Sequence, residues 1–170
     1  MAINFRVRGV WLVQAAILLL LFGCGTVAQF DTAAFQNAVQ LKFETLALID
    51  KSGNKFAAHK TEVDALTAKY ESAFDAASKT PANQAVAQAW QVIRGAQSGS
   101  AGEYFHTWRQ RGTLRPVIRA EKKAQIGRHF DYVICLETAK QGGPACTNPL
   151  GASPSAPPVP AVDTPGDGSQ

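Results

Sequence analysis

The sequence predicts an all-α protein, a small antiparallel bundle of four to five helices with a disordered C-terminal tail rich in Pro and Gly. Apolar residues recur at three- and four-residue steps over most of residues 31–141, and no stretch alternates convincingly with a period of two. The chain has 170 residues, of which 46% are apolar and 18% charged. These values fit one globular domain and exclude both a wholly disordered chain and a multi-span membrane protein.

The first predicted helix covers residues 31–51 and begins at Asp31, a favourable N-cap residue. Gly53 is suited to a left-handed position that ends it. With apolar residues on two sides, we expect this helix to be the central and most buried one. Its main apolar face comprises Phe35, Val39, Phe43, Leu46 and Ile49, and a second side carries Leu41 and Leu48.

The second predicted helix, residues 55–79, has the most regular pattern in the chain. Its apolar series has the spacing of a seam that packs against a neighbouring antiparallel helix. Thr80 and Pro81 resemble an N-cap and first helical residue, so a third helix is expected from there to about residue 96. The seam consists of Phe56, His59, Val63, Leu66, Tyr70, Ala73 and Ala77, with Phe74 beside it.

The C-terminal half is predicted to hold two more helices. A loop at residues 97–102 precedes a short helix that Gly112 stops, and a long helix covers residues 116–140 unless Gly127 divides it. From residue 142 to 170 the chain is rich in Gly, Pro, Ala and Ser, which predicts a flexible tail. The expected core residues are Val86, Ala89, Trp90 and Ile93 in the third helix, and Ile126, Phe130, Val133, Ile134 and Leu136 in the last.

The N-terminus has the pattern of an export signal. Residues 1–9 carry two arginines and no acid, and residues 10–22 are apolar except for Gln14. This length suits a signal-peptide core of about 7–15 residues and is shorter than the roughly 20 residues of a membrane-spanning helix. The alternative is a retained anchor helix over residues 10–30. Both interpretations place the rest of the chain outside the cytoplasm and beside a membrane.

The residues Leu21-Phe22-Gly23-Cys24 resemble the lipobox of bacterial lipoproteins, a resemblance limited to residues 1–25. It implies a signal peptide at 1–23, acyl chains such as palmitate on Cys24, and a linker over 24–30. Such chains hold a protein on a bilayer almost permanently. Gly25 stands where an Asp would resemble an inner-membrane retention signal. The resemblance therefore favours the periplasmic side of the outer membrane.

If Cys24 is lipidated, Cys135 and Cys146 are the two remaining cysteines. An exported chain meets an oxidising environment, which favours a disulfide between them. Two free thiols are the alternative, should the export interpretation be wrong.

Residues 101–141 carry eight basic and four acidic side chains in a chain of net charge +4. Such a surface attracts an anionic lipid, a cell-wall glycan or an acidic protein, whereas the compartment disfavours nucleic acid. The alternative is a solvated polar face. The candidate binding residues are Arg109, Arg111, Arg115, Arg119, Lys122 and Lys123, with Arg128 nearby and the aromatic residues Tyr104 and Trp108 flanking them.

Histidines and carboxylates offer a weaker hypothesis. Glu103 and His106 have the Glu-x-x-His spacing of di-iron bundles, and His59 and Glu62 supply the same residue types in reverse order. Together they would suit a metal such as zinc. The alternative for His59 is a packed histidine with a backbone partner. We expect no resident cofactor.

No familiar catalytic motif occurs in the sequence. The leading hypothesis is therefore a lipid-anchored envelope protein with a non-catalytic structural or protein-interaction role. The alternatives are a module that binds an anionic partner through residues 104–128, and a metal-binding helical bundle.

Overall fold

The structure is a computed structural model that describes residues 28–149, and within that range it contains helices and no strand. The predicted all-α bundle is confirmed. The signal peptide, Cys24 and residues 150–170 of the tail lie outside the described residues. The elements are α2 (Thr32–Lys51), the 3-10 turn η1 (Phe56–Ala58), α3 (Lys60–Ser78), the 3-10 turn η2 (Pro81–Asn83), α4 (Gln84–Arg94), α5 (Ala101–Arg111) and α6 (Pro116–Ala139).

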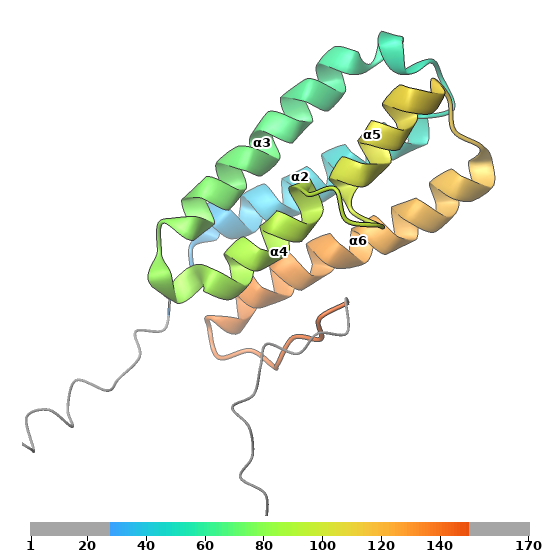
Figure 1. Cartoon of the computed structure of the whole chain (residues 1–170). Helices are drawn as coiled ribbons and strands as arrows, with labels where there is room; N and C mark the ends of the chain where they lie inside the picture. The colour runs from blue at the N-terminus through green and yellow to red at the C-terminus, as the bar shows by residue number, and fades with distance from the viewer. Residues whose placement is uncertain (1–27, 150–170) are drawn as a thin grey trace, which may run out of the picture.

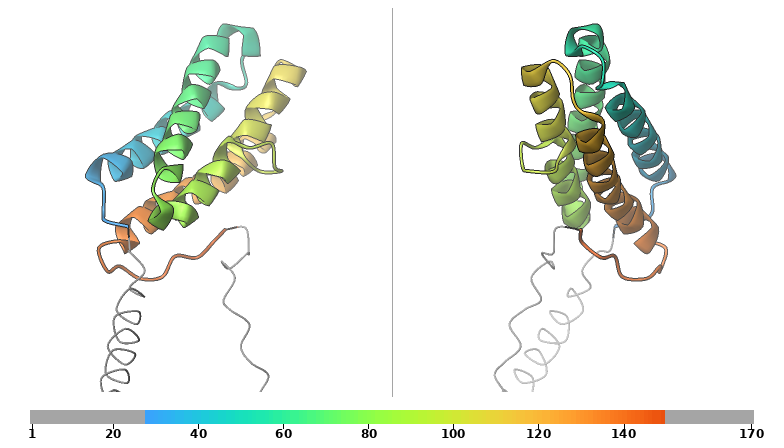
Figure 2. Two further views of the ribbon diagram at one scale, coloured as in Figure 1. Left: turned by 60° about the vertical axis from the view of Figure 1, so that its left-hand side comes forward. Right: turned by 90° about the vertical axis from the view of Figure 1, so that its right-hand side faces the viewer.

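The helices form an antiparallel bundle in which α4 and α5 follow one another along its length (Figures 1 and 2). α2 and α3 make a hairpin, and α6 returns beside α2 and α4. Ala28 and the start of α2 lie at the end of the bundle where the α3–α4 turn and the end of α6 also lie. We call this the entry end. The opposite end joins α2 to α3 and α5 to α6.

Helix boundaries follow the expected capping chemistry at Asp31 and Gly112 but not at Thr80 and Gly53. Thr80 makes no side-chain capping hydrogen bond and precedes the 3-10 turn η2, so α4 begins only at Gln84. The Asp31 carboxylate accepts hydrogen bonds from the backbone N–H groups of Ala33 (2.8 Å) and Ala34 (3.2 Å). Gly112 has φ +76°, the left-handed conformation that favours glycine after a helix. The same prediction for Gly53 is wrong. There Ser52 ends α2, and its buried hydroxyl donates to the Ile49 carbonyl.

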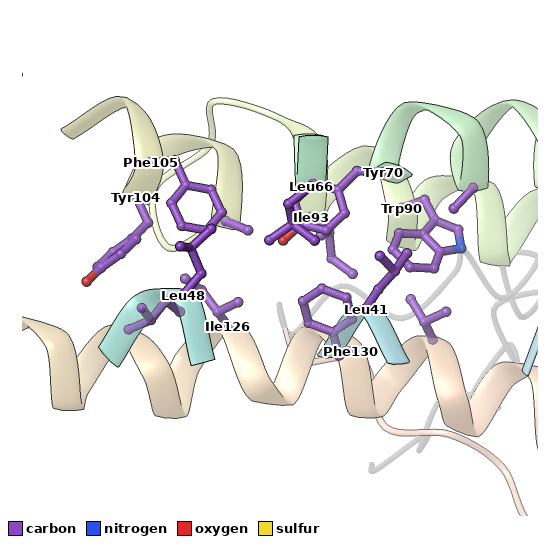
Figure 3. Packing of buried hydrophobic residues seen from close by; sticks show 14 of the residues in the cluster. Leu41, Leu48, Leu66, Tyr70, Trp90, Ile93, Tyr104, Phe105, Ile126 and Phe130 are labelled. Atoms are coloured by element: carbon purple, nitrogen blue, oxygen red, sulfur yellow. The ribbon is translucent and has the colours of Figure 1, made fainter. Parts of the chain in front are cut away.

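The core confirms the seam of α3 and corrects the face of α2. All seam residues of α3 and η1 are buried except His59, which is half-buried. In α2, Ile49 of the predicted main face is fully buried, but Phe43 is 67% exposed, and Leu41, Thr45 and Leu48 point inward. α2 packs mainly against α3 and α6. It buries five of its 20 residues, a smaller share than the four of 11 in α4 and in α5, so it is not the most buried helix. Figure 3 shows Leu41 and Leu48 packed among the aromatic residues of α3 to α6.

The predicted cores of α4 and α6 largely hold. Val86, Ala89, Trp90 and Ile93 are buried in α4. In α6, Ile126, Phe130 and Val133 are fully buried, whereas Ile134 and Leu136 are partly buried. Gly127 does not divide α6, which is continuous from Pro116 to Ala139. Gly127 is buried, and Leu46 of α2 lies 4.0 Å from where a Cβ would be.

Cys135 and Cys146 are joined in the structure, with their Cα atoms 5.8 Å apart. Cys135 lies in the last turns of α6, and Cys146 lies in the segment that follows it. The crosslink therefore ties the chain after α6 back against the bundle near the entry end (Figure 1).

Candidate interaction surface at the basic end

The end of the bundle opposite the entry end is built from two chain turns, residues 52–60 and 109–119, and we call it the basic end. Two backbone hydrogen bonds join the turns. The Phe56 N–H donates to the Gly112 carbonyl and the Leu114 N–H donates to the Ser52 carbonyl, each at 2.8 Å. These bonds hold two segments far apart in the sequence side by side.

A buried aromatic layer supports these turns from below. Trp108 is fully buried, its indole N–H donates to the Asn54 carbonyl at 3.1 Å, and its ring meets that of Phe56 edge-on at 5.4 Å. The Tyr104 hydroxyl pairs with the Ser52 hydroxyl at 2.5 Å, and burial raises the pKa of Tyr104. Tyr104 and Trp108 are thus core residues. The prediction that they flank the basic surface is wrong.

Three of the predicted basic residues already have acidic partners. Arg109 pairs with Asp64 at 3.1 Å, and Lys123 pairs with Asp50 at 2.5 Å. Lys122 lies 3.8 Å from Glu103 and donates to the Gln125 side chain at 3.3 Å. Exposed pairs of this kind contribute little stability, but they neutralise the charge that a partner would meet.

Arg119 has a partner without a charge. Its Nη1 donates to the Asp50 carbonyl at 3.1 Å. The guanidinium lies over Gly53, where an added Cβ would come within 2.2 Å of Nη1. Gly53 therefore provides a close approach rather than the predicted left-handed cap, and the positive charge of Arg119 is not balanced by a carboxylate.

Arg111 and Arg115 are exposed, and no carboxylate pairs with either among the residues that the structure describes. The same holds for Lys55, which the backbone bond from Phe56 to Gly112 brings beside them. Sequence reasoning missed Lys55, because it is an isolated lysine at least 54 residues before these arginines in the sequence. It comes close to them only in the folded structure. Val117, on the first turn of α6, is 62% exposed.

The acidic residues of this end are mostly occupied. Asp64 pairs with Lys60 as well as Arg109, and its pKa is lowered mainly by the hydrogen bond from Lys60. Glu62 accepts from Lys51 at 2.5 Å and lies 2.8 Å from His59 Nδ1. The hydrogen bond from Lys51, and then that from His59, lowers the pKa of Glu62. Glu121 lies further along α6.

The predicted metal ligands do not form one site. His59 contacts Glu62 and the face of Trp108, so its partner is a side chain rather than the backbone. Glu103 instead accepts from Thr107 (3.0 Å) and lies near Lys122, and His106 is exposed. Within residues 28–149, no three His, Cys, Asp or Glu side chains gather as a possible metal site.

The described part of the chain thus defines a class, an all-α bundle with one disulfide and one basic end. Comparison with family models, with curated proteins and with solved structures finds no match. Among residues 28–149, no helix is both long enough and apolar enough to span a bilayer.

Proposed function

We propose that this protein is a lipid-anchored lipoprotein of the bacterial cell envelope, with a non-catalytic interaction role. The observation that carries the proposal is Cys24 at the end of the Leu21-Phe22-Gly23-Cys24 sequence, directly after a charged segment and an apolar core of signal-peptide length. Acyl chains on Cys24 would hold the bundle at the periplasmic face of the outer membrane.

Two features of the structure support this proposal. The sulfur atoms of Cys135 and Cys146 are bonded, and such bonds persist in oxidising compartments outside the cytoplasm. Ala28, four residues after Cys24, is also buried at the entry end, close to Thr32 where α2 begins. A tether at Cys24 would therefore hold the entry end against the membrane.

Metabolic labelling tests the proposal. Cells that express the full chain are grown with an alkyne-bearing palmitate analogue, and the purified protein is examined for label and intact mass. We expect label on the wild-type chain, a mature N-terminus at Cys24, and loss of both in Cys24→Ser. A chain that is unlabelled and found in the cytosol, with Cys135 and Cys146 reduced, would refute the proposal.

A further inference from the structure

The basic end is the part of the described surface where cations gather without matching acids. Lys55, Arg111 and Arg115 have no carboxylate partner there, and Arg119 donates only to a carbonyl. The nearby acids Asp50, Glu62 and Asp64 are each held by at least one other base. The excess of positive charge is therefore concentrated at the basic end, because the tertiary structure pairs the nearby acids with other bases.

The position of this surface distinguishes among anionic partners. α2 has 20 residues and runs from the entry end to the basic end, a length of about 30 Å at 1.5 Å per residue. Attraction between exposed charges is screened over about 8 Å at physiological ionic strength. A bundle held at its entry end, with α2 running away from the membrane, would present its unpaired cations beyond the reach of the headgroups around its own anchor.

We propose that the basic end binds a carboxylate-rich polypeptide segment of another protein, and not the lipid in which this protein is anchored. Guanidinium groups bind carboxylates in a bidentate geometry, and Arg111 and Arg115 are free to do so. Val117 adds an exposed apolar side chain on the first turn of α6, the helix that Arg115 precedes. Arginine together with an apolar contact is typical of protein interfaces.

Binding is measured with the full chain in nanodiscs of phosphatidylcholine, and the probe is a fluorescent peptide of three Glu-Glu-Leu repeats. We expect saturable binding that weakens with salt and falls at least fivefold in Arg111→Gln/Arg115→Gln. The matched control is Lys79→Gln/Arg128→Gln, which removes two exposed cations that lie outside the basic end and form no ion pair within residues 28–149, and it should change affinity less than twofold. Equal losses in both variants, or no binding by the wild type, would overturn the proposal.

A second peptide tests the apolar contact. Replacement of leucine by serine in the repeats should weaken binding, and Val117→Ser should reduce affinity only for the leucine peptide. Polygalacturonate serves as a carboxylated glycan of similar charge. If polygalacturonate binds more tightly than the leucine peptide and its affinity is unchanged in Val117→Ser, the partner is a glycan and the proposal is wrong.

The inference that the basic end does not bind the surrounding lipid rests on the proposed anchor at Cys24, and a separate experiment tests it. Fluorophores are placed at Val117→Cys and, at the entry end, at Ala82→Cys, and energy transfer to labelled headgroups is recorded in vesicles. We expect strong transfer from position 82 and weak transfer from 117, with or without phosphatidylglycerol. Strong transfer from 117 when phosphatidylglycerol is added would overturn the inference.

The two proposals fail in different ways. A chain that carries no lipid on Cys24 would contradict the proposed function, whether it shows no transfer from either position or is held by a retained anchor helix. Peptide binding can be measured in Cys24→Ser as well, because the basic end lies within the described bundle, at the end opposite Ala28. Loss of peptide selectivity with a normal anchor would contradict only the inference.

Discussion

The two ends of the bundle are closed by different means. At the basic end, Trp108, the Ser52–Tyr104 hydroxyl pair and two backbone hydrogen bonds fill and fasten the turns. At the entry end, residues 28–32 and 80–83 surround a hollow of about 730 Å³, and the buried Asn83 Oδ1 has no hydrogen-bond partner. A disulfide ties the chain near that end. Non-covalent packing thus fixes the positions of charges at one end, whereas a covalent link holds the other.

The largest expected change in stability comes from a substitution that disrupts the packing of the basic end. Trp108→Ala removes a fully buried ring and should lower the free energy of unfolding by about 3–5 kcal/mol in urea denaturation. Hydrogen exchange at the Phe56 and Leu114 amides should accelerate more than exchange at Ala33, the capped start of α2. Phe43→Ala is the control, because that ring is 67% exposed and its loss should cost less than about 0.5 kcal/mol.

Removal of the disulfide should destabilise the entry end of the bundle. The crosslink spans 11 residues, and in the chain-entropy model a loop of this size contributes about 3 kcal/mol. Cys135→Ser/Cys146→Ser should therefore unfold at a lower temperature, while exchange at Phe56 and Leu114 measured below that temperature stays as in the wild type. Faster exchange at both ends by the same factor would show that the ends are not independent.

Two buried hydroxyl pairs sharpen the comparison. Ser52→Ala and Thr45→Val each deprive a buried tyrosine of its partner, Tyr104 at the basic end and Tyr70 in the middle of the bundle. Each substitution should cost about 1–3 kcal/mol in urea denaturation. Only Ser52→Ala should also weaken binding of the Glu-Glu-Leu peptide, because Ser52 belongs to the turn that carries Lys55. Equal effects on binding would refute this assignment.

The smallest effect comes from His129, a buried histidine in α6 whose Nδ1 has no hydrogen-bond partner. Burial lowers its pKa, and Arg128 adds to this. The folded protein therefore resists protonation of His129, whereas the unfolded chain binds the proton. The free energy of unfolding should therefore keep its full value above pH 6.5, the ordinary pKa of histidine, and should decrease as the pH falls below that value.

Urea midpoints at pH 7.5 and 5.5 measure this dependence, which His129→Gln should reduce. Carboxylates act in a lower range. The lowered pKa values of Glu44 and Glu62 stabilise the fold above their ordinary value of 4.5, and that contribution disappears only in more acidic solution. An unchanged pH dependence in His129→Gln would rule out this role.

Local sequence signals predicted the helices well. The apolar residues from Phe56 to Ala77 in η1 and α3 form a single stripe, so the side that faces the core follows from their spacing alone. α2 was harder to predict, because apolar residues occur on more than one side of it. Which side is buried depends on where α3 and α6 pack, and Phe43 is left outside for this reason.

The candidate surface was predicted only in part. The run of basic residues after position 108 is visible in the sequence, but its ion pairs with Asp50, Asp64 and Glu103 join helices that are distant along the chain. The aromatic residues Tyr104 and Trp108 share a helix with Arg109 and Arg111, yet the helix turns them into the core. A helix separates neighbours by about 100° per residue, so adjacency in sequence is not adjacency on a surface.

The sequence by itself determined the helical periodicity, the caps at Asp31 and Gly112 and the only two cysteines available to pair if Cys24 is lipidated, since each depends on residues and their immediate spacing. Only the tertiary structure decided which cations stay unpaired and that Lys55 joins Arg111 and Arg115. Charge is balanced between side chains that meet in space, and the packing of α2, α3, α5 and α6 decides which of them meet.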